Sequence, residues 1–204
     1  MTIKKGEPWG APFVVPVETR DVAGDHDLAA GTKSDIHIVQ SGDIFDALGQ
    51  PNAPIVGQTR TLIHIDALQC TITTKNGNHE LLAASSVTIG RWRTTPWTSR
   101  RFVCVTNGGL YKNKNVAPRA HPNDGMLDIV EVSAAMPWRQ RAQSYQRART
   151  GDHLPHPLIS VSRGTECEFS LEHSRETLCV DFQPIENWLS IRVQIIPDYW
   201  QVIV

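Results

Sequence analysis

Apolar and polar residues alternate along much of the chain, most regularly near its C-terminus. In the segment 190–196 the two kinds follow each other from Ser190 to Ile195, as in an antiparallel strand that buries one face. Short apolar runs separated by turn residues continue from about residue 59, and Asn76-Gly77 between two of them is a strong hairpin signal. The pattern predicts a mainly β fold, an antiparallel β-sandwich-like domain. The expected strands are residues 13–18, 36–39, 61–66, 68–74, 79–84, 87–92, 102–106, 126–132, 158–162, 167–171, 177–182, 189–196 and 200–204.

The first part of the chain has a different pattern, in which strands and short helices alternate. Residues 25–33 begin with acidic side chains, which suit a helix N-terminus, and a second helix, entered from residue 41, ends at Gly49. We therefore expect a short α/β section over residues 1–58 and a β-sandwich domain over residues 59–204. The sandwich domain has one predicted helix, near 137–149, because Pro137 suits a first helical turn and Gly151 can end it.

Composition and charge narrow the range of functions. The 204 residues, 40% hydrophobic and 20% charged, are ordinary for a soluble globular protein of one domain, or of one domain with an appendage. The net charge of −1 gives no overall polyelectrolyte role, so nucleic acid is not an expected partner. The N-terminus has no apolar secretion signal, and no run approaches the ~20 apolar residues of a membrane span. We expect a cytoplasmic protein, for which peripheral contact with a membrane stays open.

The four cysteines favour the same compartment. Cys70, Cys104, Cys167 and Cys179 are widely spaced, form no C-x-x-C pair and lie in apolar runs, where cysteine behaves as a small buried hydrophobe. This pattern favours reduced thiols over a disulfide framework or a zinc site.

A basic and aromatic stretch over residues 91–101 is the first candidate for ligand binding. It contains two tryptophans and no acid, and its four arginines are Arg91, Arg93, Arg100 and Arg101. Arginine binds phosphate through paired hydrogen bonds, and aromatic rings beside basic groups are typical of contacts with lipid interfaces. We therefore predict that these four arginines bind an anion.

The predicted helix near 137–149 is a second basic stretch, but its arginines spread over more than one face. The alternative is a solvated helix whose Trp138, Ala142 and Tyr145 pack inward. After the helix, His153 and His156 stand three residues apart. A metal site would need a third ligand that no telling spacing supplies, so we expect these two to be polar loop residues.

Residues 116–130 form a stiff polar turn between two strand-like runs. Pro118 and Pro122 fix the local backbone, and Gly125 can adopt a positive φ. The turn also holds Arg119 and His121, which we add to the anion-binding candidates, and carboxylates that could face a cation. The alternative is that it only connects two strands.

The same turn carries a resemblance to a known family. Residues 105–128 resemble the C-terminal β-sandwich half of the diacylglycerol kinase and bacterial lipid kinase family in the order and spacing of Asn107-Gly108, Pro118, Ala120, Asp124-Gly125, Leu127 and Asp128. Residues 42–51 resemble the end of the family's GTGND-x-x-R-x-L-G-x-P element, at Gly42, Asp43, Leu48, Gly49 and Pro51. The resemblance covers roughly residues 36–204 and implies that residues 1–58 are a remnant of the nucleotide-binding lobe.

The chain departs from this family at the positions that carry its chemistry. The phosphate-binding GGDGT motif does not occur in these residues, so ATP is not expected as a ligand. In the family's L-D-G-E segment the glutamate is implicated in proton transfer; here Asp181 is kept, but Phe182 and Gln183 replace the glycine and the glutamate. Glutamine cannot act as that base, and a bulky phenylalanine is not expected at positive φ. We therefore interpret Asp43, Asp181 and Gln183 as degenerate positions and expect no catalytic residue.

The resemblance also implies one metal site. The family's Asp-Asp-Gly loop helps to hold a structural divalent cation, which places Mg²⁺ or Ca²⁺ at Asp124, with Asn123 in place of one carboxylate. No other cofactor is expected.

Three functions stay open. The first, which the missing GGDGT motif and glutamate favour, is a catalytically silent lipid-kinase-like domain that binds a lipid, an anionic membrane surface or a partner protein. The second is a lipid kinase that acts in trans with an ATP-binding lobe on a partner chain. The third is a purely structural or interaction module. Edge strands of an open sandwich often pair, so a homodimer is compatible with all three.

Overall fold

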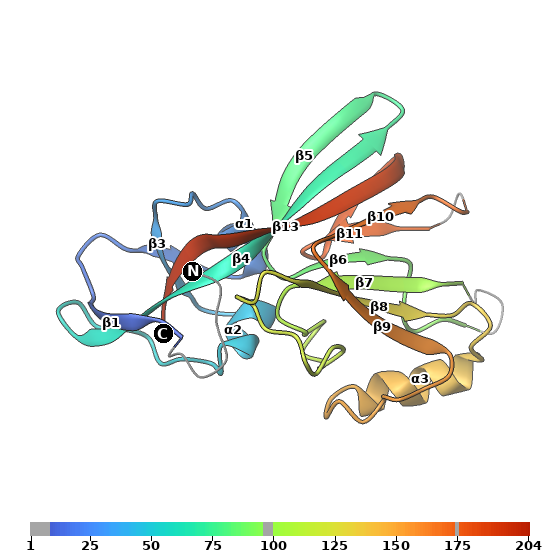
Figure 1. Cartoon of the computed structure of the whole chain (residues 1–204), viewed down its shortest axis with the longest axis horizontal. Helices are drawn as coiled ribbons and strands as arrows, with labels where there is room; N and C mark the ends of the chain where they lie inside the picture. The colour runs from blue at the N-terminus through green and yellow to red at the C-terminus, as the bar shows by residue number, and fades with distance from the viewer. Residues whose placement is uncertain (1–8, 96–99, 174–175) are drawn as a thin grey trace.

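A computed structural model describes residues 9–95, 100–173 and 176–204 (Figure 1). Its elements, in chain order, are β1 (Ala11–Val14), β2 (Arg20–Val22), α1 (Asp25–Ala29), β3 (Ile36–Val39), α2 (Asp43–Ala47), β4 (Thr59–Thr74), β5 (Gly77–Ala83), β6 (Ser86–Ile89), β7 (Phe102–Thr106), β8 (Leu127–Val132), α3 (Trp138–Arg147), β9 (Ile159–Gly164), β10 (Glu166–Ser170), β11 (Leu178–Val180), β12 (Gln183–Ile185) and β13 (Trp188–Ile203). The described strands form two sheets, so the predicted mainly β fold is confirmed.

The first sheet, sheet A, is built on β4 and β13, two strands of 16 residues that run antiparallel across the middle of the molecule (Figure 1). β5 pairs with one end of β4, and β10 pairs with the same end of β13. At the other end β1 pairs with β4, while β3 lies parallel to β13 and β2 parallel to β3. The section before residue 58 thus shares one sheet with the sandwich.

Two pairs of expected strands are joined in the structure. Residues 61–66 and 68–74 both belong to β4, and residues 189–196 and 200–204 both belong to β13. Pairing continues through the junction, because Ile196 lies opposite Ala67 and Trp200 lies opposite Ile65. The residues between Ile196 and Trp200 bulge out, with Asp198 at a φ of 53°. A bulge bends a strand without ending it, so the apolar pattern is interrupted although the strand continues.

The second sheet, sheet B, is antiparallel, with the strand order β12-β11-β6-β7-β8-β9. One of its faces packs against the β5 and β10 end of sheet A, and the fully or almost fully buried residues between the two sheets include Leu68, Val87, Val105 and Ile191. This arrangement confirms the predicted sandwich. β12 was not expected from the sequence, because Pro184 argues against a strand unless the strand lies at an edge.

The other face of sheet B is covered by α3 and by the loop over residues 110–117, with Trp92, Phe102 and Val130 buried beneath them. A third cluster, which includes Ile44 and Trp200, joins α1 and α2 to the β1 and β3 end of sheet A. No helix in the described part of the chain combines the length and the apolar character needed to cross a membrane.

Helix α3 confirms the predicted helix, but the prediction of which side chains pack inward is partly wrong. Trp138 is 41% exposed, whereas Arg141 and Ser144 are buried. An arginine can be buried here because its guanidinium finds backbone carbonyls to donate to, as described below. Pro137 caps the helix instead of lying in its first turn.

Candidate functional site

The face of sheet B that α3 covers carries one row of side chains across all six strands. The strand register aligns in this row, from β12 to β9, Pro184, Cys179, Thr88, Cys104, Val130 and Val161. The middle of the row, at Cys104 and Val130, is fully buried beneath the helix and the loop. Each end of the row opens into a hollow.

We call the hollow at the β12 end the basic pocket. Its volume is about 400 Å³, and it is lined by Thr88, Gly90, Arg91, Trp92, Arg93, Tyr111, Lys112, Tyr145, Thr177, Cys179, Phe182 and Pro184. None of the lining residues that the structure describes is acidic. The pocket therefore combines cations with aromatic rings and has no internal counter-charge.

The cations of the basic pocket are available to a ligand. Arg91 and Arg93 are exposed, and neither forms an ion pair with any residue that the structure describes. The ammonium group of Lys112 lies 5.5 Å from the ring centre of Tyr111 and 5.7 Å from that of Phe182. Such contacts hold the ammonium group without neutralising it.

The β11–β12 turn forms one side of the pocket, and it contradicts the expectation for Phe182. Both central residues have positive φ, 42° at Asp181 and 66° at Phe182. This is the mirror-image turn that suits a tight hairpin. The Phe182 ring packs against Tyr111, with 5.9 Å between ring centres, and is 36% exposed. The ring contacts and the bonds of Asp181 offset the backbone strain of a side chain in this region.

The carboxylate of Asp181 is fully occupied by hydrogen bonds inside the protein. Oδ2 accepts from the amide of Ala84 at 2.7 Å, and Oδ1 accepts from the amides of Ser85 and Ser86 and from the Ser85 hydroxyl at 2.9 to 3.0 Å. Burial raises the pKa of Asp181, while these bonds act in the opposite direction. Asp181 thus fixes the turn onto the start of β6.

Asp43, another carboxylate singled out from the sequence, holds the loop that carries Lys112. Its two oxygens accept from the amides of Lys112 at 2.7 Å and Asn113 at 2.8 Å. Its own amide donates to Asp25, whose carboxylate also accepts from Ile44. Burial raises the pKa of Asp25 to about 6. Asp181 and Asp43 therefore both accept hydrogen bonds from backbone amides, and they hold the turn and the loop that border the pocket.

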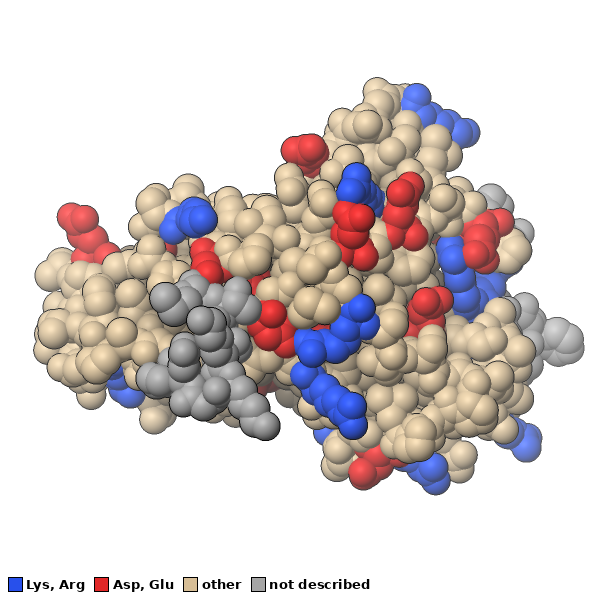
Figure 2. Space-filling view, viewed as in Figure 1, with Lys and Arg blue, Asp and Glu red and all other residues tan. Residues whose placement is uncertain are grey.

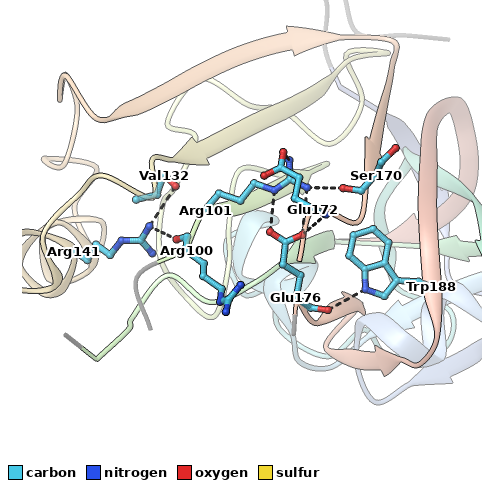
Figure 3. A network of polar contacts seen from close by, with 8 residues as sticks. All are labelled: Arg100, Arg101, Val132, Arg141, Ser170, Glu172, Glu176 and Trp188. Carbon is cyan, nitrogen blue, oxygen red and sulfur yellow. Dashed lines mark hydrogen bonds and ion pairs between the residues drawn. The ribbon is translucent and has the colours of Figure 1, made fainter. Parts of the chain in front are cut away.

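Of the four predicted anion-binding arginines, Arg101 is engaged within the protein (Figure 3). Its guanidinium pairs with the buried carboxylate of Glu176, at 3.2 Å from Nε to Oε1, and with Glu172 at 2.5 Å. It also donates to the carbonyl of Ser170 at 2.6 Å. Arg101 therefore joins the segment before β7 to the segment after β10.

Sequence reasoning missed Arg141, which is fully buried and holds both ends of the basic stretch. Figure 3 shows its contact with the Arg100 end. Its guanidinium donates to the carbonyls of Arg91 and Trp92 at one end and of Arg100 at the other. A further bond of 2.8 Å reaches the carbonyl of Ser133. Burial lowers the pKa of this guanidinium. Residues 96–99, which include Trp97, lie outside the described residues.

At the predicted cation site, the carboxylate of Asp124 forms an ion pair with Arg163. Oδ2 of Asp124 accepts from the guanidinium of Arg163, whose Nε lies 3.1 Å from Oδ1 of Asp128. Oδ1 of Asp124 accepts from the amide of Met126 at 3.1 Å. In the described part of the chain, no group of three His, Cys, Asp or Glu side chains is arranged to hold a metal ion.

The remaining candidates lie apart from the basic pocket. Arg119 is exposed. His121 packs edge-on against Trp9 at 4.5 Å, and its Nδ1 accepts from the amide of Asn123. His153 is buried against Trp92, whereas His156 lines the hollow at the other end of the row.

Asp66 is a second buried group that the sequence did not single out. Its oxygens accept from the amides of Asp198 at 2.9 Å and Gly125 at 2.8 Å, which ties the polar turn to the bulge of β13. Burial raises the pKa of Asp66 to about 6. The sequence indicates its burial in one way only: Asp66 is an acid at a position of the strand where the alternating pattern calls for an inward side chain.

Comparisons with known proteins agree with the fold described above. A family model described as the YegS C-terminal NAD kinase beta sandwich-like domain matches residues 58–204, which confirms the resemblance predicted from residues 105–128. No curated relative matches the chain. A solved diacylglycerol kinase structure from Bacillus anthracis strain Sterne is similar with a TM-score of 0.58 and 14% identity, over 87% of this chain and 72% of that one. Yeast NADH kinase complexed with NADH is similar with a TM-score of 0.53 and 10% identity, over 89% and 59%. At these identities the two structures show a shared fold.

Proposed function

The chain belongs to the family of YegS C-terminal NAD kinase beta sandwich-like domains, and from that premise we propose that it is a lipid-kinase-like domain that binds an anionic phospholipid without transferring phosphate. The observation that carries this proposal is the basic pocket, with its unpaired arginines, its Lys112 and its aromatic walls. A guanidinium binds phosphate oxygens in pairs, and aromatic rings suit the interface between headgroup and acyl chain.

The neighbouring turn supports binding over catalysis. A general base needs a free lone pair near the proton that it removes. Asp181 has both oxygens engaged by amides and a hydroxyl, and Gln183 cannot take up a proton. Asp43 accepts from two backbone amides, which fix its carboxylate on the loop that carries Lys112. The carboxylates around the pocket shape it and leave its positive charge in place.

Vesicle flotation tests the binding. The protein should float with phosphatidylcholine vesicles that contain phosphatidylglycerol and should stay behind with phosphatidylcholine alone. The double variant Arg91→Glu with Arg93→Glu should lose flotation, because it reverses charge at the pocket. The matched control, Arg139→Glu with Arg149→Glu, changes net charge equally at exposed positions of and just after α3 and should still float. Arg101 is unsuitable for this test, since its removal would leave Glu176 unpaired.

A footprint on Cys179 locates the ligand within the protein. This thiol lines the basic pocket and is partly buried. Alkylation of Cys179 should slow when phosphatidylglycerol vesicles are present, while alkylation of the partly buried Cys167 on β10 should not change. Equal slowing at both thiols would contradict binding at the pocket.

A phosphotransfer assay tests the second half of the proposal. The pure protein should not phosphorylate diacylglycerol with ATP, and Gln183→Glu should not create activity, because Asp181 remains engaged. Turnover by the pure protein would contradict the proposal. Turnover that appears only with an added protein containing a GGDGT motif would instead identify a kinase acting in trans. Failure to bind any anionic vesicle would leave a structural or interaction module.

A further inference from the structure

β9 is an outer strand of sheet B and is poorly protected as an edge. It lies last in the strand order, next to β8 alone. The opposite outer strand, β12, contains Pro184, which has no amide to offer to a further strand. β9 has the sequence Ile-Ser-Val-Ser-Arg-Gly, with no proline, and its four central residues are exposed. The two edges of one sheet therefore differ in their capacity to accept another strand.

The hydrogen-bond pattern identifies the free groups of β9. The amide of Ser133 donates to the carbonyl of Leu158 at 3.0 Å, so Leu158 faces β8. Direction alternates along an antiparallel strand, so the even-numbered residues of β9 face β8 and the odd-numbered residues face away. The amide of Ile159 is engaged within its own turn. The N–H and C=O groups of Val161 and Arg163 point outward, and no described strand lies beyond them.

A groove accompanies this edge on the face that α3 covers. We call it the β9 groove; its volume is about 940 Å³. Val161, 40% exposed, forms part of its floor, and Leu154 and Pro155 form part of a wall. Side chains of a strand added to β9 would alternate between the two faces of sheet B, so every second one would lie over this groove.

The charged side chains of the groove limit which kind of segment can bind there. Arg163 is neutralised by Asp124 and Asp128, whereas Arg119 is exposed and pairs with no residue that the structure describes. In the middle of Figure 2, side chains of lysine or arginine lie beside side chains of aspartate or glutamate. A second copy of β9 has no acid to offer to Arg119, so self-pairing would not satisfy it.

We propose that β9 accepts an extended segment of a partner protein whose groove-facing side chains are apolar apart from one acid. The backbone of the segment bonds to Val161 and Arg163, as in other cases of strand addition. Its apolar side chains enter the β9 groove, and an acidic side chain pairs with Arg119. The proposal does not depend on lipid binding at the basic pocket.

A synthetic peptide with Val, Glu and Val on one face tests this interface: acetyl-Thr-Val-Thr-Glu-Thr-Val-Thr-amide, titrated into the isotopically labelled full chain. The amide signals of Val161 and Arg163 should shift, and their hydrogen exchange should slow. Val161→Pro removes one outward donor without touching the β8 side, so it should weaken binding about tenfold. Arg119→Glu should weaken binding about fivefold. A peptide with lysine in place of glutamate should instead bind to the Arg119→Glu variant more tightly than to the unmodified chain. Arg139→Glu is the charge-matched control and should bind as the unmodified chain does.

Three outcomes would overturn the proposal. The first is no shift at Val161 or Arg163 at a peptide concentration of about 1 mM, above which binding is too weak to be specific. The second is equal binding by Val161→Pro. The third is a dimer in sedimentation velocity that Val161→Pro dissociates, because a second copy would then cover the edge. The unfolding midpoint of each variant should match that of the unmodified chain, so that loss of binding cannot come from unfolding.

Discussion

The two ends of one row of side chains have opposite properties. At the β12 end, the basic pocket has unpaired arginines, no acid among its described lining residues and a strand edge closed by Pro184. At the β9 end, the groove has its central arginine paired with two acids and a strand edge that is open. One end therefore offers side-chain charge, and the other offers backbone hydrogen bonds.

Under the two proposals above, one face of a sandwich sheet carries two kinds of recognition. Unpaired cations attract anions over several ångströms and suit small charged groups or surfaces. Open backbone groups act only at hydrogen-bond distance and suit an extended chain. The buried middle of the row, at Cys104 and Val130, separates the two ends. Substitutions at one end should therefore leave binding at the other end unchanged.

The largest expected effect comes from Asp181→Ala, which removes the support of the basic pocket. Three amides and one hydroxyl would lose their acceptor in a buried site, and the free energy of unfolding should fall by about 3 kcal/mol. Asp181→Asn keeps one acceptor oxygen and should lose less. Urea unfolding measures both. Equal stability of Asp181→Ala and the unmodified chain would show that the turn holds without its carboxylate.

Arg141→Met should have the next largest effect, because it leaves several carbonyls without their common donor. We expect a loss of about 2 kcal/mol in the free energy of unfolding, together with weaker flotation on phosphatidylglycerol vesicles. The peptide should still bind at β9. The control is Arg139→Met on the same helix, whose exposed side chain should change stability by no more than ~0.5 kcal/mol. Unchanged flotation by folded Arg141→Met would separate the buried arginine from the pocket.

Much of the sandwich could be predicted from the sequence, because alternation and turn residues are local signals. The hairpin at Asn76-Gly77 and helix α3 were found in this way. The two long strands were not, because their continuity depends on pairing between residues more than a hundred positions apart. The short strand β12 was missed because its proline is acceptable only at an edge, and strand order is not visible in the sequence.

The site was predictable in outline only. Four clustered arginines indicated an anion site, but the sequence could not show that Arg101 pairs with Glu176. Nor could it show that Arg91 forms no ion pair with the residues that the structure describes. Arg141 resembles any solvated arginine on a helix until its carbonyl acceptors are known. The expectation for Phe182 was wrong because local backbone preference was overridden by the hydrogen bonds of Asp181 and by ring packing.

The pH dependence of the unfolding free energy should distinguish the two ends of the row, with an effect smaller than those of the two substitutions above. Burial raises the pKa of Asp128, at the β9 groove, to about 6, against the lowering influence of Arg163. A carboxyl group whose pKa is higher in the folded than in the unfolded state stabilises fully below the unfolded value, here 3.8, and loses this contribution as pH rises through about 6. Asp128→Asn should therefore flatten the fall in unfolding free energy between pH 4 and 6, by at most about 1.4 kcal/mol per pH unit.

The basic pocket should not respond over the same range. None of its described lining residues is acidic, and phosphatidylglycerol does not titrate between pH 4 and 6, so flotation should be constant. Asp25 and Asp66 also have raised pKa values of about 6, so the variant should keep part of the slope. An unchanged slope in Asp128→Asn would place the titration elsewhere.

The smallest expected effect on stability is that of Phe182→Gly. This substitution removes the aromatic ring from the basic pocket and leaves the cations of the pocket in place, so it separates the contributions of ring and charge to lipid binding. Glycine relieves a backbone strain of about 1 kcal/mol at positive φ, and loss of the ring contact with Tyr111 costs a similar amount. The net change in unfolding free energy should therefore be below about 1 kcal/mol. Phe182→Ala keeps the strain without the ring and should be the less stable of the two. Flotation should weaken in both variants if the ring contacts lipid, whereas equal flotation of all three proteins would mean that the pocket binds by charge alone.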